Sequence, residues 1–478
     1  MPASPLRPML VPLIVACALF MENLDSTIIA TALPTIARSL DEDPLRLNLA
    51  ITSYLLSLAV FIPLSGWVAD RYGARPVFRA AIVTFTIGSA CCGLAQSLPA
   101  LVAARVLQGL GGAMMVPVGR LVMLRSVSKS ELVRAMSYVT VPALIGPVLG
   151  PPLGGFIVTY SSWRWIFYIN LPIGLLGIAL ATMFIENVKE EADWPLDLRG
   201  FVLAGTGLAG LMFGFETAGR GVLPLPIVAC LLAGGAICTA LYVLHSRVHA
   251  FPIVDLGLLR IPTFASAVVG GSLFRVGIGA LPFLLPLMLQ LGFGLSPFAS
   301  GLLTFASAAG AMTMKMTAAP IIRALGFRRV LLGNAVISSL FVMSYALFSP
   351  ATPHWIILAA LLAGGFFRSL QFTSTNTLVF ADVPAPLLSR ATSFQSMAQQ
   401  LSVSIGVGIG ALLLHVTLLA RGKTALGADD FFAAFLAVGL ISLSSILFYL
   451  PLAREAGAEV SGHHAAPEAL TSALPDKR

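Results

Sequence analysis

Two acidic side chains lie inside a long apolar stretch near the start of the chain, where a charge is expensive. Glu22 and Asp25 follow the apolar run Met9–Phe20, and the stretch continues to about Arg38. A helix of that length is roughly 40 Å long, enough to span a bilayer, and the i, i+3 spacing places both carboxylates on one face. A carboxylate at membrane depth is costly unless it faces water, pairs with a cation or takes up a proton. Two interpretations follow: a site that binds and releases protons or cations, or an acid permanently paired with an arginine.

The composition identifies the class of protein. Of the 478 residues, 57% are hydrophobic and only 10% are charged, whereas about 25% of the residues in a soluble domain are charged. We therefore expect an all-α polytopic membrane protein. The net charge of +8 does not indicate nucleic-acid binding, because Lys and Arg occupy short hydrophilic breaks rather than one patch. The five cysteines lie in apolar runs without disulfide or metal spacing, and we expect no metal and no cofactor.

The apolar runs predict fourteen membrane-spanning helices. Their expected ranges are 9–38, 48–69, 77–96, 99–123, 132–160, 164–185, 198–218, 224–246, 262–291, 297–322, 328–349, 353–381, 391–417 and 429–452. The breaks richest in Lys and Arg lie near Arg75, Lys129 and Arg328, on one side of the membrane if every run spans it. The positive-inside rule makes that side the cytoplasm. We therefore expect a multi-pass plasma-membrane protein with both termini in the cytoplasm.

The chain contains an internal repeat. Two pairs of segments match at an offset of 253 residues: Gly73–Val77 with Gly326–Val330, and Gly111–Gly112 with Gly364–Gly365. Parallel repeats of six helices are a common construction of secondary transporters, with the substrate site between the halves. The expected organisation is a six-helix half at 1–190, two additional helices at 191–255 packed outside the halves, a second six-helix half at 256–453 and a disordered cytoplasmic tail at 454–478.

One hydrophilic break has the composition of a gate. The segment Gly66–Arg75 reads GWVADRYGAR. Its charges could simply set the topology, but Asp70 could also lie against the positive N-terminal end of a cytoplasmic helix. The helix that begins near Ser389, just after two prolines, is the natural partner. The residues assigned to this gate are Gly66, Asp70, Arg71, Gly73 and Arg75.

Two further runs combine small residues with features that are unusual at membrane depth. Arg105–Ala113 reads RVLQGLGGA, and a buried arginine needs an acidic partner; alternatively, Arg105 extends to the outer interface. In Pro142–Gly155, glycines repeat every four residues, so one helix face exposes bare backbone for close packing, and prolines should bend the helix. The residues assigned to this packing motif are Gly146, Pro147, Gly150, Gly154 and Gly155.

Together these segments resemble the major facilitator superfamily. Gly66–Arg75 is similar to its signature loop, Arg105–Ala113 to its fourth-helix motif and Pro142–Gly155 to the fifth-helix motif that marks exporters. Leu24–Pro34 and Trp163–Pro172 resemble the corresponding runs of the fourteen-helix drug:proton antiporters. The resemblance covers essentially the whole chain. It implies the major facilitator fold, two six-helix halves plus two extra helices.

The resemblance also implies a function. It indicates a proton-coupled secondary exporter of small amphipathic compounds, a multidrug efflux protein of a bacterial inner membrane that works by alternating access and as a monomer. An enzyme is not expected, since no His or Cys cluster lies at membrane depth, and no ATPase motif indicates a primary pump. The alternative within the same fold is a dedicated exporter of a metabolite or an organic anion.

The residue roles follow from the resemblance and from the local chemistry. The fourth-helix arginine of the family takes part in proton transfer, so Asp25 and Arg105 are assigned to proton coupling together with Glu22. Asp25 is expected to be the main coupling site, with hydroxyl donors from Ser26 and Thr27, while Glu22 shapes the cavity and favours cationic substrates.

Four residues are candidates for lining a substrate cavity: Glu22, Gln108, Arg275 and Arg368. Arg275 is central in its apolar run, where a structural ion pair and a substrate contact are equally compatible with the sequence. Arg368 departs from the family pattern because it interrupts a run of small residues. Lys315 is expected to extend to the membrane interface. Acids lie in the first half and bases in the second, so the charge of the substrate is not predicted.

Overall fold

The computed structural model describes residues 7–42, 44–128, 131–186, 195–218, 223–295, 297–423 and 426–463, and within these ranges it contains helices and no β-strand. The first part of the chain forms α1 (Arg7–Leu40), α2 (Pro44–Phe61), α3 (Ser65–Tyr72), α4 (Ala74–Leu94), α5 (Leu98–Ser126), α6 (Leu132–Tyr160), α7 (Trp165–Tyr168) and α8 (Asn170–Phe184). A 3-10 turn, Ile62–Leu64, joins α2 to α3, so that these helices act as one span.

The rest of the chain continues the pattern. Its helices are α9 (Leu198–Thr217), α10 (Leu225–Val248), α11 (Pro262–Ala265), α12 (Gly271–Gly279), α13 (Leu281–Leu287), α14 (Pro297–Ser344), α15 (His354–Leu378), α16 (Leu388–Ala420), α17 (Phe432–Ser444), α18 (Ile446–Tyr449) and α19 (Ala458–Ser461). The span that contains α11, α12 and α13 is irregular, because it includes two π-helical segments, η4 (Ser266–Gly270) and η5 (Met288–Gly292).

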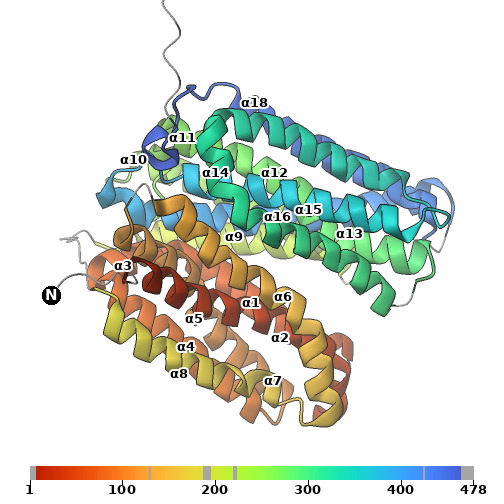
Figure 1. Ribbon diagram of the computed structural model, residues 1–478. Coiled ribbons are helices and arrows are strands. Elements are labelled where there is room, and N and C mark those ends of the chain that lie inside the picture. The colour runs from red at the N-terminus through yellow and green to blue at the C-terminus, as the bar shows by residue number, and fades with distance from the viewer. Residues whose placement is uncertain are drawn as a thin grey trace, which may run out of the picture.

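Twelve helical stretches of the described residues are long and apolar enough to cross a membrane, as expected for a multi-pass protein. The predicted count of fourteen is not established by them. One of the twelve, Ala299–Leu347, passes through Gly326, whose φ of 74° and ψ of 159° are not helical. A straight helix of that length would be about 70 Å, more than twice the hydrocarbon thickness of about 30 Å. The chain therefore turns back at Gly326 (Figure 1).

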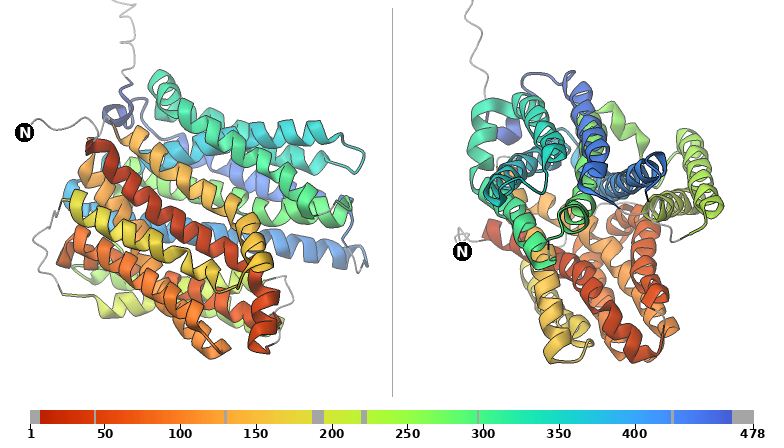
Figure 2. Two further views of the ribbon diagram at one scale, coloured as in Figure 1. Left: turned by 60° about the horizontal axis from the view of Figure 1, so that its bottom comes forward. Right: turned by 90° about the vertical axis from the view of Figure 1, so that its right-hand side faces the viewer.

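The helices form two bundles that lie side by side. In Figure 1 the helices α1 to α8 form the lower bundle and the helices α11 to α18 form the upper one. The end-on view in Figure 2 shows the green-yellow helices α9 and α10 at the side of the molecule. Leu208 and Met212 of α9 pack against Ala59 of α2 and near Met397 of α16, so α9 contacts both bundles. The buried residues of α10 are few (Val228, Gly235 and Tyr242).

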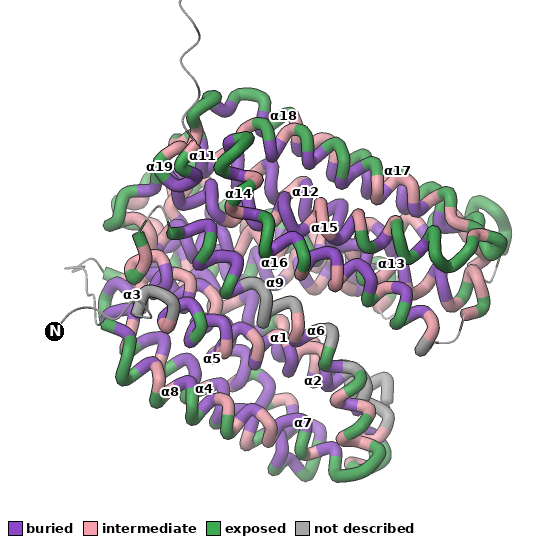
Figure 3. Tube along the Cα trace, viewed as in Figure 1, coloured by how far each residue is buried: buried purple, intermediate pink, exposed green. Residues whose placement is uncertain are grey.

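Burial follows the inner faces of both bundles (Figure 3). Apolar residues exposed on the outside are numerous, among them Leu225, Met316 and Trp355, which are 76%, 85% and 69% exposed. A soluble protein rarely leaves such a surface open, whereas a bilayer covers it. Exposed apolar side chains of this kind are expected of a membrane-spanning protein.

The predicted disordered tail does not begin at residue 454. Residues Ala458–Ser461 form α19, in which Val460 is buried, and the ring Nδ1 of His463 lies 2.9 Å from the backbone oxygen of Arg323. Gly457 has a φ of 69°, which lets the chain turn closely over Phe327. The polar composition of this segment does not indicate that it packs on the second bundle, because the packing depends on a few apolar side chains. Residues 464–478 lie outside the described part.

Candidate functional site

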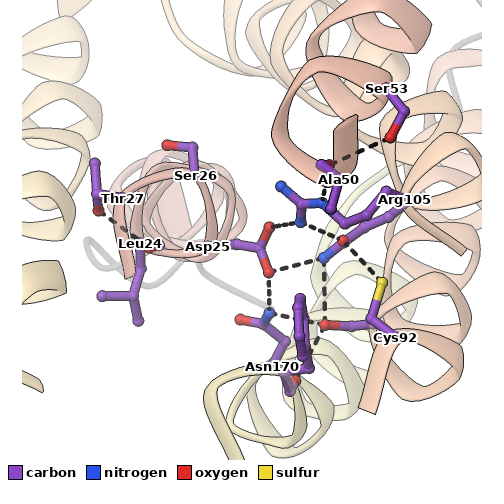
Figure 4. A network of polar contacts seen from close by, with 12 residues as sticks. Leu24, Asp25, Ser26, Thr27, Ala50, Ser53, Cys92, Arg105 and Asn170 are labelled. Atoms are coloured by element: carbon purple, nitrogen blue, oxygen red, sulfur yellow. Dashed lines mark hydrogen bonds and ion pairs between the residues drawn. The ribbon is translucent and has the colours of Figure 1, made fainter. Parts of the chain in front are cut away.

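The first-helix acid and the α5 arginine form an ion pair in the interior of the first bundle. Arg105 Nη1 donates to Asp25 Oδ2 over 2.6 Å, and neither side chain is exposed to solvent. Figure 4 shows Asp25 pointing from α1 toward Arg105. The alternative in which Arg105 extends to the outer interface is therefore wrong. A charged hydrogen bond of this length in a dry environment is strong, and it makes the ionised carboxylate tolerable there.

Amide side chains complete the coordination of the carboxylate. Asp25 Oδ1 accepts hydrogen bonds from Gln108 Nε2 at 2.8 Å and from Asn170 Nδ2 at 2.9 Å. Ser89 Oγ accepts from both amides and donates to the backbone oxygen of Phe167 at 3.1 Å. The carboxylate is thus held by donors from two further helices, α5 and α8 (Figure 4). A change in the charge of Asp25 therefore alters the hydrogen bonds that join α1 to α5 and α8.

The prediction that Ser26 and Thr27 donate hydrogen bonds to Asp25 is wrong. Ser26 Oγ donates to the backbone oxygen of Asn23 at 2.9 Å, and Thr27 Oγ1 donates to the same oxygen at 3.0 Å. Residues one and two positions from Asp25 point to other sides of the helix, as Figure 4 shows. The hydroxyl and amide groups around Asp25 therefore come from neighbouring helices.

The arginine is positioned from several directions at once. Arg105 Nε donates to the backbone oxygen of Ala50 at 3.0 Å, and Nη1 also donates to Gln108 Oε1 at 2.7 Å. Its guanidinium carbon lies 4.4 Å from the ring centre of Tyr54, a cation–π geometry. These contacts fix the arginine in one orientation, and the buried Tyr54 hydroxyl beside it has no hydrogen-bond partner in the described part of the chain.

Glu22 lies one turn before Asp25 and has a different environment. Its side chain is 8% exposed, and Oε2 has no hydrogen-bond partner in the described part of the chain. No arginine or lysine is paired with it there. The two acids of α1 are therefore not equivalent: both oxygens of Asp25 accept hydrogen bonds, whereas Glu22 has an oxygen without a partner among the described residues.

The substrate-cavity candidates are not brought together. Gln108 uses both its amide nitrogen and its amide oxygen within the Asp25 network, which leaves it no free group for a substrate. Arg275 and Arg368 lie in the other bundle, where Arg275 Nη2 donates to Asn376 Oδ1 at 2.6 Å and Arg368 Nη2 to Ser307 Oγ at 2.9 Å. Neither arginine forms the structural ion pair that the sequence left open, as far as the described residues extend.

Lys315 was expected to reach the interface, and it does not. It is 7% exposed, and its Nζ donates to Thr373 Oγ1 at 2.5 Å. The hydroxyl of Thr373 on α15 satisfies part of the ammonium group within the bundle, so the side chain does not need to extend to the headgroups.

The acid of the predicted gate does contact the helix that begins near Ser389. The hydroxyl of Ser389, in the first turn of α16, donates to Asp70 Oδ2. Arg125 Nη2, at the end of α5, lies 3.6 Å from Asp70 Oδ1. Asp70 is 1% exposed. The acid therefore joins the first bundle to the N-terminal end of a helix of the second bundle, where the helix dipole favours a negative charge.

Small residues allow this contact to be close. A Cβ atom on Gly66 would lie 2.8 Å from Ser393 Oγ and 3.0 Å from the backbone oxygen of Ser389. The hydroxyls of Ser65 and Ser393 are 2.7 Å apart. The two helices α3 and α16 can approach to this distance only because position 66 carries no side chain.

The other gate candidates serve the turn itself. Gly73 has a φ of 94°, which favours glycine, and it ends α3 and begins α4. Arg75 Nη1 donates to the backbone oxygen of Ile185 at 3.2 Å, just after α8, where a cation complements the helix C-terminus. Arg71 is exposed. The residues of the predicted gate thus divide into two groups. Gly66 and Asp70 contact α16, whereas Gly73 and Arg75 form a turn that is hydrogen-bonded to the end of α8.

The packing glycines of α6 lie against α1. A Cβ on Gly146 would lie 3.0 Å from the backbone nitrogen of Leu24, and one on Gly150 would lie 3.0 Å from Thr27 Cβ. Gly154 is buried. The prediction that Gly155 serves close packing is wrong, because a Cβ there would meet no atom within 4 Å. Gly155 points about 100° away from Gly154 around the helix axis. The side chain of Pro147 lies outside the described part.

Several residues of the site were not singled out from the sequence. Tyr54 and Ser89 carry no local signal beyond a polar group in an apolar run, and Asn170 lies in a segment that resembled a family run without an assigned role. Arg125 lies in the Lys- and Arg-rich break near Lys129, and by sequence it indicates only topology. Buried polar residues in a membrane span are the signal that could have found the first three.

Comparisons with known proteins point to one family. The model of the family described as "Major Facilitator Superfamily" matches residues 15–281 and 267–476. Proteins named "Putative multidrug resistance protein MdtD" from Salmonella heidelberg (strain SL476) and from Salmonella newport (strain SL254) are each 44% identical over 422 residues, covering 87% of this chain and 88% of the relative.

Solved structures share the fold at low sequence identity. The human organic anion transporter MFSD10 (TETRAN) has a TM-score of 0.65 and 15% identity, over 94% of this chain and 100% of that one. The proton:xylose symporter XylE bound to 6-bromo-6-deoxy-D-glucose has a TM-score of 0.62 and 16% identity, over 92% and 95%.

Proposed function

Because this chain belongs to the major facilitator superfamily, we propose that it is a proton-coupled secondary exporter of small amphipathic compounds that works by alternating access. Proteins of this superfamily are transport proteins, which makes a transport role the premise. The direction of transport, the coupling ion and the substrate class are the proposal.

The buried pair of Asp25 and Arg105 is the observation that carries the proposal. Asp25 accepts from α5 and α8, and Arg105 is held by the backbone at Ala50 in α2. A proton on Asp25 removes the charge that balances Arg105, so protonation and the packing of these helices are linked. A group of this kind binds a proton in one arrangement of the bundle and releases it in the other.

Glu22 is assigned the substrate-facing role. It lies one turn from Asp25 with an oxygen that has no partner among the described residues, and it can meet the polar group of a substrate without disturbing the Asp25 network. Asp25 is the main coupling site in this proposal, and Glu22 shapes the cavity beside it.

The contact between Asp70 and Ser389 acts as the gate. It joins the two bundles at the end where α3 meets α16, the left end of Figure 1. In the proposed cycle this contact breaks when the transporter opens at that end. The concentration of Lys and Arg near that end supports a cytoplasmic location for it and for both termini.

The proposed architecture has fourteen spans. It consists of two six-helix halves at 1–190 and 256–453 with the two helices of 191–255 beside them. The bend at Gly326 divides α14 into two spans, and α6 has the length of a span with its 29 residues. The proposed location is the inner membrane of a bacterium, and the proposed functional unit is the monomer.

The names of the 44% identical relatives support multidrug export. A dedicated exporter of a metabolite or an organic anion is the second candidate. It is favoured by the buried Arg275 and the half-buried Arg368 of the second bundle, which carry no acidic partner in the described residues. The two candidates share the fold and the coupling site and differ in the substrate.

Everted membrane vesicles test the proposal. We expect the wild-type protein to transport ethidium when a pH gradient is present and to stop when the gradient is collapsed. Substrate-induced proton release from the purified protein should be lost in Asp25→Asn and kept in Glu22→Gln, which should bind cations more weakly. Glu216→Gln, which removes an acid near the end of α9, is the control and should behave as the wild type.

The opposite pattern for the two α1 variants would reverse their roles. Unchanged proton release in both would exclude this helix from coupling, and transport that is independent of the pH gradient would contradict proton-coupled export.

A further inference from the structure

Arg275 is a buried cation with no acidic partner among the described residues. It is 3% exposed and lies on α12, in the middle of its span. Its Nη2 donates to Asn376 Oδ1 at 2.6 Å, while its Nη1 is buried and has no hydrogen-bond partner among the described residues. A buried arginine that serves only structure is normally paired with a carboxylate or surrounded by carbonyl groups. Arg275 therefore has an unused donor.

The local structure holds this guanidinium in place. The π-helical segment η4 ends at Gly270, just before α12 begins, and such segments occur frequently at functional sites. A Cβ on Gly271 would lie 3.0 Å from Arg275 Nη1, so the glycine leaves room for the arginine head. The guanidinium carbon lies 5.6 Å from the ring centre of Phe372.

A second arginine approaches from the other bundle. Arg120 of α5 donates through Nη2 to Gln399 Oε1 at 3.1 Å, and Gln399 Nε2 donates to Asn376 Oδ1 at 2.8 Å. Asn376 Oδ1 is the same oxygen that accepts from Arg275. Arg120 Nη1 is also buried and without a partner in the described part. Two cations from opposite bundles thus meet at a pair of neutral amides.

We propose that Arg120 and Arg275 together bind the anionic group of a transported substrate, a carboxylate or a phosphate, while the contact between Asp70 and Ser389 is closed. The proposal rests on the proposed function, and it adds an anionic class of substrate to the cationic compounds that Glu22 favours.

The chemistry selects an anion. The amide oxygens that face the arginines already accept hydrogen bonds from them. The groups left over here in the described part of the chain are the two Nη1 donors of Arg120 and Arg275 and one neutral acceptor, Oε1 of Gln395, whose Nε2 donates to Asn376 Oδ1 at 3.4 Å. A substrate cation would add a third positive charge to this region. An anion satisfies the free donors and balances charges that repel each other, and the planar guanidinium matches a carboxylate or phosphate geometrically.

The position couples this site to the gate. Arg120 precedes Arg125, the neighbour of Asp70, by five residues of α5, about 7.5 Å along the helix. Gln399 lies ten residues after Ser389 on α16. When α5 separates from α16, Arg120 moves away from Gln399 and from Arg275. An anion that bridges the two arginines therefore favours the closed gate and links substrate binding to the transport step.

Dye binding to the purified protein in phosphatidylcholine nanodiscs tests the proposal. The probes are carboxyfluorescein, which is anionic, and rhodamine 6G, a cationic dye of related shape, followed by fluorescence anisotropy. We expect Arg275→Gln and Arg120→Gln each to weaken carboxyfluorescein binding at least tenfold and to leave rhodamine 6G binding within threefold. Both variants should fold, because an uncharged glutamine replaces a cation that has an amide partner but no acidic one in the described part of the chain.

Lys315→Gln is the matched control. It removes another buried cation of the second bundle, whose partner is Thr373, and should change carboxyfluorescein binding less than threefold. An equal loss in this variant would show that only the general positive field matters and would contradict a two-arginine site. Absence of saturable carboxyfluorescein binding to the wild type, or unchanged binding in both arginine variants, would also contradict it.

A lipid headgroup has the same chemistry as a soluble anion. Nanodiscs that contain phosphatidylglycerol separate the two: unchanged carboxyfluorescein affinity supports a substrate site, and competition by the lipid contradicts it. Binding of carboxyfluorescein without gradient-driven transport of ethidium would contradict the proposed function alone. Gradient-driven transport of ethidium without carboxyfluorescein binding would contradict the anion site alone.

Discussion

Asp25→Asn should destabilise the protein because it breaks a buried ion pair on one side only. The wild-type carboxylate accepts from Arg105 at 2.6 Å, from Gln108 at 2.8 Å and from Asn170 at 2.9 Å. An asparagine offers one oxygen in place of two and brings an N–H₂ group toward other donors. At least one donor loses its acceptor, and the charge of Arg105 is no longer balanced.

The magnitude follows from the burial. Both side chains of the pair are 0% exposed, so solvent does not weaken the interaction. Removing one partner of a buried ion pair costs about 3–5 kcal/mol. Arg105→Gln should cost a similar amount. The double variant removes both charges, so the two costs should not add, and the coupling between the sites should be on the order of 2–3 kcal/mol.

The assay is thermal unfolding of the four proteins in one detergent, monitored by intrinsic fluorescence. We expect the two single variants to unfold several degrees below the wild type. The unfolding temperature of the double variant should fall by less than the sum of the two single losses. An Asp25→Asn variant as stable as the wild type would show that Asp25 is not ionised in this state. Additive losses in the double variant would show that the two side chains are not energetically coupled.

Three further predictions concern the gate, the topology and the α6 contact. Asp70→Asn should weaken closure by about 0.5–2 kcal/mol without unfolding the protein, and a wild-type transport rate in a well-expressed variant would refute this. With the native cysteines replaced, an impermeant thiol reagent applied to intact cells should label Gly422→Cys and not Arg75→Cys. Labelling of Arg75→Cys alone would show that the membrane topology is the reverse of the one predicted. Gly150→Ala should cost about 1–3 kcal/mol by overpacking, while Gly155→Ala, which meets open space, should unfold at the wild-type temperature.

The sequence by itself determined the class of protein, the helical character of its apolar runs and the two contacts that local chemistry demands. A carboxylate and an arginine at membrane depth require partners, so a pair of Asp25 and Arg105 was one of the arrangements that the sequence left open, and the family resemblance assigned both to one site. The same reasoning located the partner of Asp70, because a helix that begins near Ser389 offers its positive end. Hydropathy and charge act over short stretches of chain, so these features can be read without a fold.

Only the tertiary structure decided which neutral groups complete each site. Asn170 reaches Asp25 from 145 residues away, and Arg120 and Arg275 meet through amides on two other helices. An amide or a hydroxyl carries no charge that must be balanced, so nothing in its own segment of chain indicates its partner. Its role depends on the rotation of its helix about the axis. That rotation is determined when side chains of several helices pack together, and it cannot be obtained from any one of them.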